Sequence, residues 1–261
     1  MVVRMSPERL ELAPLLARRE LWLLLSTAYL DPYYRERFAL LRDPEYRQRA
    51  LRAAGLLAGE LATIELGPGE VQPAGLSPGR LFDALDEEWA TVDAAYRQLF
   101  GLTAISASCP PCEVEYEPNE DITYRSQRLA DASGFYRAFG LQVSNRAGER
   151  LDHVTMQAEF LYVLLAKEAA ALQERNQEAA DICREARRKF FEEHVGWWLP
   201  AFSRLLTRSV PGKFYSQLAV FTASLSAAER VCLGLPPFQI RCVLKSAPAE
   251  PADECFDCKP C

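Results

Sequence analysis

Apolar residues that recur at intervals of three and four positions constrain this chain more than any other feature of its sequence. Between residues 81 and 99 this spacing is followed by Leu81, Leu85, Trp89, Val92, Tyr96 and Leu99. Such residues line one face of a helix, so the segment is predicted to be a single helix. Comparable runs occupy 129–139, 154–172 and 214–225, whereas no comparable run alternates with the two-residue period of a strand. The pattern predicts a compact all-α fold of about ten helices.

Pro, Gly and Asn interrupt the helical pattern at several places. One break, Gly140–Leu151, separates two strongly periodic regions. We interpret this break as a hinge between an N-terminal helical half, residues 1–145, and a C-terminal helical half, residues 146–240, unless both pack as one globular domain. Residues 241–261 are rich in Pro, Ala, Asp and Glu, and they are predicted to form a flexible tail that contains cysteines.

The charge and hydropathy of the chain argue against several classes of protein. Its 30 Lys and Arg side chains against 36 Asp and Glu give a net charge of -6, and no basic block indicates a nucleic-acid partner. No apolar run reaches the ~20 residues that a membrane span requires. The first residues lack the order of a secretory signal, which predicts a cytoplasmic protein. No nucleophile–base pair or phosphate-binding loop has the spacing of an active site, so we predict that the chain is not an enzyme.

Asp152 and His153 lie where the predicted hinge meets the helix that is expected from Val154. On one interpretation Asp152 caps that helix, its carboxylate accepting backbone N–H groups, and His153 merely occupies the first turn. On the other, an Asp–His pair at a hinge contacts a basic or hydrogen-bonding segment of a partner. Residue type and position alone favour the cap, although a capping side chain can also bind a partner.

Five of the eight cysteines form two clusters, Cys109-x-x-Cys112 and Cys255-x-x-Cys258-x-x-Cys261. A thioredoxin-like role for the first cluster would need a strand–helix–strand context, which the pattern does not predict. Together the clusters hold enough thiolates for a four-cysteine zinc site, and an iron–sulfur cluster is the other metal hypothesis. The alternative is that all five are reduced thiols without a ligand. A metal-carrying or redox protein is therefore the second functional hypothesis.

Aromatic residues could form either a binding platform or part of the core. Helical spacing is shared by Phe135, Tyr136, Phe139, Trp197 and Trp198. This spacing favours packing in the core. His194 follows two glutamates near a predicted helix end, where its cationic form would interact favourably with the helix dipole. We assign it no functional role.

Several segments match, in order, the motifs of one known family. These are Tyr96–Gly101 (like Tyr-x-x-Leu-Phe-x-Gly), the stretch Cys-Pro-Pro-Cys-Glu at 109–113 (like Pro-Pro-Tyr-Glu), Ser126–Leu141 (ending Gly-Phe-Tyr-x-Ala-Phe-Gly-Leu), Glu149–His153 (Glu-x-x-Asp-His) and Glu159–Phe160. In this combination, the chain resembles the TorD/DmsD-like chaperones of molybdenum enzymes, also called redox enzyme maturation proteins. That family is related to the delta-type chaperones of nitrate reductases.

The resemblance implies an all-helical chaperone without catalytic turnover. Members bind the twin-arginine leader of a catalytic subunit that lacks its cofactor, and they hold it back from export until the molybdopterin cofactor is inserted. The expected partner is therefore such a subunit with its twin-arginine signal peptide. The expected assembly is a monomer or a dimer, and domain swapping is one way in which such a dimer could form.

The resemblance also assigns residues to a client-binding site. Asp152 and His153 fall on the family's leader-binding positions, and the site is expected to include Glu149, Tyr96, Leu99, Phe100 and Glu159. An acidic side chain beside an apolar groove suits a leader that offers two arginines and an apolar run.

Two positions depart from the family's pattern. Gln157 stands where many members have Glu, which removes a charge that could pair with a leader arginine. Leu151 stands where members commonly have Pro, which removes the fixed φ of that residue from the hinge. Both changes affect the expected groove rather than the expected fold.

Overall fold

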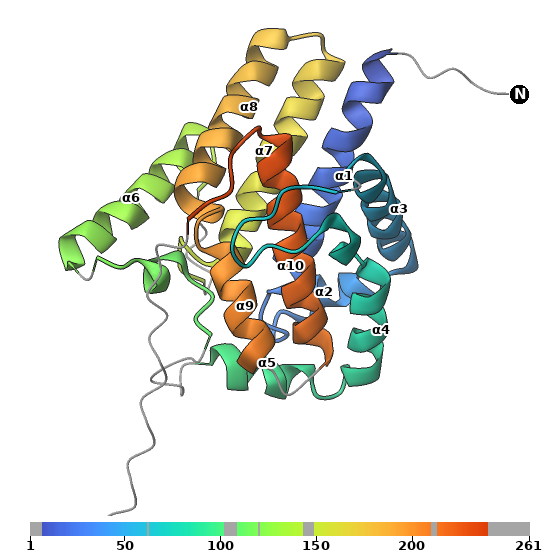
Figure 1. The fold of residues 1–261 in the computed structure, drawn as a ribbon, viewed down its shortest axis with the longest axis vertical. Coiled ribbons are helices and arrows are strands. Elements are labelled where there is room, and N and C mark those ends of the chain that lie inside the picture. The colour runs from blue at the N-terminus through green and yellow to red at the C-terminus, as the bar shows by residue number, and fades with distance from the viewer. Residues whose placement is uncertain are drawn as a thin grey trace, which may run out of the picture.

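The computed structural model describes residues 7–61, 63–101, 109–119, 121–142, 149–209 and 213–239, with side chains from residue 12 onward. The α-helices are α1 (Pro7–Ala28), α2 (Arg35–Phe38), α3 (Pro44–Glu60), α4 (Pro78–Glu88), α5 (Val92–Phe100), α6 (Ile122–Ala138), α7 (Val154–Gln173), α8 (Gln177–Phe190), α9 (Leu199–Ser209) and α10 (Lys213–Cys232). Shorter helical turns are η1 (Ala39–Arg42), η2 (Pro73–Gly75), η3 (Glu113–Tyr116) and η4 (Phe191–Val195). Within these ranges strand-like pairing is limited to one isolated bridge (Figure 1). The all-α prediction is confirmed.

Side-chain caps fix where several helices begin. Asp43 precedes α3, and its carboxylate accepts the backbone N–H of Tyr46 at 2.7 Å. Pro44 then occupies the first helical position, where no backbone donor is needed. Asp121 caps α6 and Asn176 caps α8 in the same way. Because these signals are local, the sequence alone can place the helices.

One predicted helix proves to be two. The apolar stripe over residues 81–99 runs through α4 and α5, which are separated by a turn at Trp89–Thr91. The ring of Trp89 stacks on Phe38, with 5.7 Å between the ring centroids, so it remains on the buried face. No Pro or Gly marks the turn, and the buried face continues across it. The prediction of a single helix is therefore wrong, because helical spacing cannot reveal a turn that preserves the stripe.

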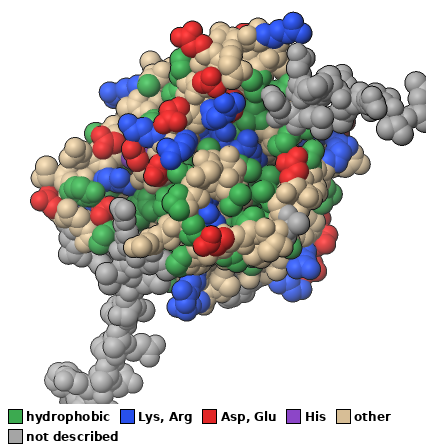
Figure 2. Space-filling view, turned by 45° about the horizontal axis from the view of Figure 1, so that its top comes forward, with side chains coloured by type: hydrophobic (Ala, Val, Ile, Leu, Met, Phe, Trp, Pro, Cys, Tyr) green, Lys and Arg blue, Asp and Glu red, His purple; other side chains and the backbone are tan. Residues whose placement is uncertain are grey.

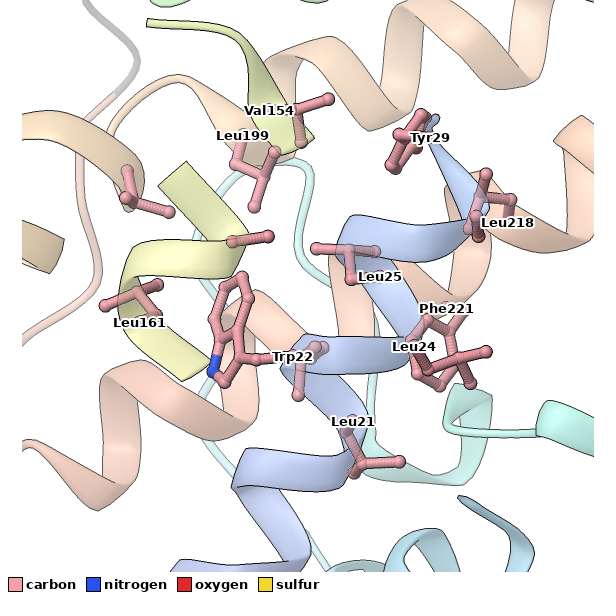
Figure 3. Packing of buried hydrophobic residues seen from close by; sticks show 14 of the residues in the cluster. Leu21, Trp22, Leu24, Leu25, Tyr29, Val154, Leu161, Leu199, Leu218 and Phe221 are labelled. Carbon is pink, nitrogen blue, oxygen red and sulfur yellow. The ribbon is translucent and has the colours of Figure 1, made fainter. Parts of the chain in front are cut away.

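Helix α1 lies at the centre of the helical assembly because its middle is apolar on nearly every side. Leu21, Trp22, Leu24 and Leu25 are all fully buried there (Figure 3). Helix α1 packs against α3, α7 and α10, while α7 packs against α8, and α10 packs against α4 and α9. A single apolar cluster joins residues of these helices.

This apolar cluster crosses the boundary proposed between residues 1–145 and 146–240, because α1 packs directly on α7. The division into two halves and the hinge between them stay predictions, since residues 143–148 lie outside the described part of the chain. The tail 241–261, predicted to be flexible, also lies outside it.

The aromatic residues that were expected in the core do pack there. Tyr136, Trp197 and Trp198 are buried, and Phe135 and Phe139 are partly buried against the apolar cluster. The prediction of core packing rather than an exposed platform is confirmed.

The face shown in Figure 2 carries basic and acidic side chains interspersed with apolar ones, and neither sign of charge dominates it. Among the described helices, none is both long and apolar enough to cross a membrane.

Two buried carboxylates in the helical core are paired with arginines. Glu229 of α10 accepts hydrogen bonds from Arg187 of α8 and from the indole N–H of Trp22 in α1, the latter at 3.1 Å. Glu168 of α7 accepts from Arg187 and from Arg184, each at 3.0 Å. A buried charge without a partner is strongly destabilising, so these pairs hold α1, α7, α8 and α10 in one arrangement.

Candidate functional site

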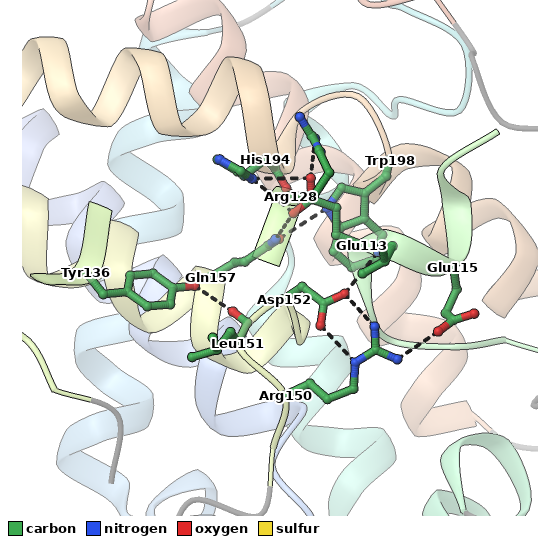
Figure 4. Close-up of polar contacts among 11 residues, drawn as sticks. Glu113, Glu115, Arg128, Tyr136, Arg150, Leu151, Asp152, Gln157, His194 and Trp198 are labelled. Carbon is green, nitrogen blue, oxygen red and sulfur yellow. Dashed lines mark hydrogen bonds and ion pairs between the residues drawn. The ribbon is translucent and has the colours of Figure 1, made fainter. Parts of the chain in front are cut away.

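Two segments that are distant in sequence lie side by side at the N-terminal end of α7. We call residues 109–116 the bridge loop and residues 149–153 the bridge segment. An antiparallel bridge joins them at Cys112 and His153. Backbone hydrogen bonds on both sides of this pair, at 2.9 and 3.1 Å, fix the register of the two segments. The side chains of both segments are therefore held close together at the start of a long helix (Figure 4).

Asp152 is buried, and its carboxylate already has three hydrogen-bond donors. The backbone N–H of Val114 donates to Oδ2 at 3.0 Å. The Arg150 guanidinium donates two hydrogen bonds to the same carboxylate, both at 3.0 Å, in the two-pronged geometry typical of an arginine–carboxylate pair. Its remaining nitrogen, Nη1, donates to Glu115 at 2.7 Å. The acidic side chain predicted to bind a leader is thus paired with an arginine of its own chain.

His153, and not Asp152, caps α7. The backbone N–H of Thr155 donates to Nδ1 of His153 at 3.2 Å, and the His153 backbone is extended, as a capping residue requires. The interpretation of Asp152 as the cap is therefore wrong. The physical reason is the bridge, which turns the Asp152 carboxylate towards Val114 and away from the first turn of α7.

The His153 ring is held in its neutral form. Burial lowers the pKa of this imidazole to about 3, and the nearby Arg150 charge acts in the same direction. Because Nδ1 accepts a hydrogen bond, the ring proton belongs on Nε2, which lies 3.4 Å from Oε2 of Glu149. Glu149 therefore faces a neutral partner. No Lys or Arg among the described residues pairs with it.

Tyr96 of α5 and Asp31, just beyond α1, lie close enough to Glu149 for their charges to interact. Burial raises the pKa of the Tyr96 phenol, and the charges of Glu149 and Asp31 raise it further. Burial and the charge of Asp31 likewise raise the pKa of Glu149. The structure thus brings together three chain segments around a carboxylate that no cation neutralises within the described part of the chain.

The other predicted contacts differ in their accessibility. Leu99 is 1% exposed and belongs to the core. Phe100 is partly buried and meets Tyr96 edge to face, with 5.1 Å between ring centroids. Glu159 is partly exposed on α7, where it pairs with Arg37 at 3.4 Å. A client contact at Leu99 would require the core to open, whereas Phe100 and Glu159 are accessible, and the role of all three stays a prediction.

A second polar cluster, which we call the Glu113 cluster, lies behind the bridge (Figure 4). The buried Glu113 carboxylate accepts from Arg128 of α6, from Gln157 of α7 at 2.7 Å, and contacts Nδ1 of His194 at 3.2 Å. The indole N–H of Trp198 donates to the side-chain amide oxygen, Oε1, of Gln157 at 3.1 Å. One carboxylate therefore ties the bridge loop to α6, α7 and η4.

His194 is buried beside a carboxylate and is not exposed at a helix end, as its position in the sequence suggested. The residue is 1% exposed, its Nδ1 faces Glu113, and its ring packs on Phe190 at 5.2 Å between centroids. The cause is the wide π-helical turn Phe191–Val195, which directs the ring inward.

The two departures from the family's pattern take defined places. Gln157 is buried and donates to Glu113, so its side chain faces another residue of this chain, and its effect on a leader contact stays a prediction. Leu151 is partly buried, and its backbone carbonyl accepts the phenol O–H of Tyr136 at 2.8 Å. That bond fixes the bridge segment where the family's Pro would have done so by its φ.

Sequence reasoning did not select Glu113, Glu115, Arg128 or Arg150 as site residues. The signal for Glu113 was its place in the stretch 109–113, which resembles a family motif. Arg150 lies inside the Glu149–His153 motif but at one of its variable positions, and Glu115 and Arg128 carry no periodic or spacing signal. Glu115 and Arg150 are 35 positions apart and Arg128 and Glu113 are 15 apart, so only the folded chain forms these two pairs. The pair of Arg150 with Asp152, two positions away, is local.

Cys109 and Cys112 are buried in the bridge loop. Burial raises the pKa of the Cys109 thiol to about 12, and it raises that of Cys112 as well. Metal ligands are thiolates, which such burial disfavours. Among the described residues no three His, Cys, Asp or Glu side chains are grouped to hold a metal ion. Because Cys255, Cys258 and Cys261 lie outside the described residues, the zinc and iron–sulfur hypotheses stay predictions.

The chain matches one family of known proteins over a region that includes both the bridge loop and the bridge segment. The family described as the nitrate reductase delta subunit matches residues 76–204, which include the bridge loop and the bridge segment. No solved structure matches the chain.

Three relatives share moderate sequence identity with this chain. It is 33% identical to the perchlorate reductase assembly chaperone protein of Dechloromonas aromatica over 131 residues, which are 49% of this chain and 55% of that protein. It is 31% identical to the selenate reductase assembly chaperone protein of Thauera selenatis over 144 residues, 55% of this chain and 71% of that protein. It is 28% identical to the chlorate reductase assembly chaperone protein of Ideonella dechloratans over 151 residues, 58% of this chain and 75% of that protein.

Proposed function

This chain belongs to the family of the nitrate reductase delta subunit and the reductase assembly chaperones, and from that membership we propose that it binds the catalytic subunit of a molybdopterin oxidoreductase before that subunit receives its cofactor. The family consists of assembly chaperones, so the chain acts by binding and not by turnover, as the sequence predicted. By holding the subunit until the cofactor is inserted, it prevents premature export, and it does so in the cytoplasm.

The three relatives narrow the class of client. Their names refer to reductases of perchlorate, selenate and chlorate, all of which are oxyanions. We therefore propose that the client of this chain is the catalytic subunit of an oxyanion reductase. Its twin-arginine leader is the segment whose chemistry matches the site.

The observation that carries leader binding is the state of Glu149. The Glu149 carboxylate lies beside a neutral histidine, and no Lys or Arg of the described residues pairs with it. The second carboxylate nearby, Asp31, lies 3.6 Å from Arg97, so of the two only Glu149 lacks a cation among the described residues. An arginine of a leader would supply the missing charge and would relieve the repulsion between the two carboxylates. We assign one leader arginine to Glu149. The partly buried Phe100 of α5 is the nearby side chain that can contact apolar residues of the leader, whereas Tyr96 is buried in the core.

A binding titration tests this assignment. A fluorescein-labelled peptide with two adjacent arginines and a following apolar run is expected to bind the purified chain, as measured by fluorescence anisotropy. The Glu149→Gln variant keeps the shape of the side chain but loses its charge. Losing one charged hydrogen bond should weaken binding by about 1.5 to 3 kcal/mol, or roughly 10- to 150-fold.

The control is Glu60→Gln, which removes one exposed negative charge at the end of α3 and should leave the affinity unchanged. Equal affinities of the Glu149 variant and the unchanged chain would contradict the assignment to Glu149. Absence of peptide binding by the unchanged chain would contradict leader binding itself. Co-purification with a cofactor-free catalytic subunit tests the wider chaperone role independently of the leader.

A further inference from the structure

The Arg150 guanidinium lies between two carboxylates of the bridge region, those of Asp152 and Glu115. It donates twice to Asp152 and once to Glu115, so each of its three nitrogens makes a hydrogen bond (Figure 4). Yet its side chain is 48% exposed, whereas that of Asp152 is 2% exposed. A buried carboxylate is therefore reached from solvent through a guanidinium that belongs to the chain itself.

Another guanidinium could replace this one without leaving a buried charge unpaired. An incoming arginine has the same planar fork, so it would restore the paired bonds to Asp152 and the single bond to Glu115. Arg150, already half in solvent, would then become hydrated. A lysine could not make the exchange equally well, because its ammonium group is a point charge without the two-pronged geometry.

We propose that Asp152 and Glu115 form a guanidinium cradle, and that Arg150 occupies it in the unbound chain as an internal competitor for a client arginine. This inference rests on the proposed function and deepens it: Glu149 receives one arginine of the leader and the cradle receives the other. Because Arg150 is attached to the cradle by the backbone, it competes at a high effective concentration. A lone arginine in solution is thus rejected, while a segment that is also anchored at Glu149 is admitted.

The chain contains a closely matched control for this ion pair. Arg184 is also 48% exposed, and it donates to the buried Glu168 at 3.0 Å and to the exposed Asp181 at 2.7 Å. That pair joins α8 to α7 away from the bridge. The variants Arg150→Gln and Arg184→Gln therefore remove the same charge from side chains of the same exposure. Glu168 keeps a second arginine, Arg187, whereas Asp152 keeps only the backbone N–H of Val114, so Arg150→Gln should be the more destabilised of the two.

The test is an anisotropy titration of both variants with the paired-arginine peptide and with an otherwise identical paired-lysine peptide. Arg150→Gln should tighten binding of the arginine peptide about five-fold, the equivalent of one surface ion pair of about 1 kcal/mol. Arg184→Gln should not change it. Adding Glu115→Gln to Arg150→Gln should remove the gain, because the cradle then lacks its outer carboxylate.

Each result bears on the proposal in a defined way. If the unchanged chain binds the arginine peptide and Arg150→Gln, shown by a cooperative melting transition to be folded at the assay temperature, binds it no more tightly, the competition is refuted while leader binding stands. An equal gain for the lysine peptide would also refute the cradle, because it would show an effect of net charge alone. Failure of both the unchanged chain and Arg150→Gln to bind either peptide would overturn the proposed leader binding and the competition with it.

Discussion

Replacing Glu113 by Ala removes the acceptor at the centre of the Glu113 cluster. The guanidinium of Arg128, the amide of Gln157 and the ring of His194 then lose the Glu113 carboxylate. Arg128 keeps only the backbone carbonyl of Glu193 as an acceptor, so its charge is no longer paired in this cluster. Breaking a buried ion pair by removing one partner destabilises a protein by about 3 to 5 kcal/mol. The Arg128 side chain is 18% exposed and can be partly rehydrated, so we expect the lower end, about 3 kcal/mol.

Equilibrium unfolding in urea, followed by circular dichroism, measures this loss as a change in the free energy of unfolding. In a protein of this size each kcal/mol lowers the melting temperature by about 2 to 4 °C, so the Glu113→Ala variant should melt about 6 to 12 °C lower. Glu113→Gln keeps an acceptor and the volume of the side chain. Its melting temperature should therefore lie between those of the unchanged chain and Glu113→Ala.

Glu115→Ala is the control, because Glu115 lies two residues further along the same helical turn. Its side chain is 38% exposed and its partner is the half-exposed Arg150, so its loss should be below about 1 kcal/mol. If Glu113→Ala is no more destabilised than Glu115→Ala, the cluster does not tie the bridge loop to the helices, and the reasoning fails.

Three further outcomes are expected. Peptide affinity should fall as the pH is lowered, because burial raises the pKa of Glu149 and the carboxylate becomes neutral at a higher pH than an ordinary glutamate, and Glu149→Gln should show a smaller fall. His153 should make the fold acid-sensitive. The pKa of its imidazole is lowered to about 3 in the folded chain, against about 6.5 in the unfolded chain, so the unfolded chain takes up the proton first as the pH falls. The stability that is present above about pH 6.5 is therefore lost at lower pH. The free energy of unfolding of His153→Asn, which keeps a capping oxygen, should change less between about pH 7 and about pH 5, and an unchanged slope would contradict this. Alkylation by iodoacetamide with peptide mapping should label the exposed Cys232 and spare Cys109 and Cys112, whereas equal labelling would contradict their burial.

The amino-acid sequence by itself determined the helices and the place of the site along the chain. Helical spacing and capping residues act over a few positions, so they can be read locally, and α7 does begin at Val154, as predicted. The motif match placed Asp152 and His153 directly before that helix. Where the local signal is silent, as at the turn Trp89–Thr91 inside a continuous apolar stripe, the prediction failed.

Only the tertiary structure decided which of these side chains are free to act. The bridge joins residues about 40 positions apart, and it commits Asp152 to Arg150 while Glu149 is left beside a neutral ring. His194 turned inward for a similar reason, because Glu113 from a distant loop supplies its partner. A charged residue type is compatible with a solvated surface or with a buried pair. What separates the two is the position of a partner that is remote in sequence, and that position exists only once the chain has folded.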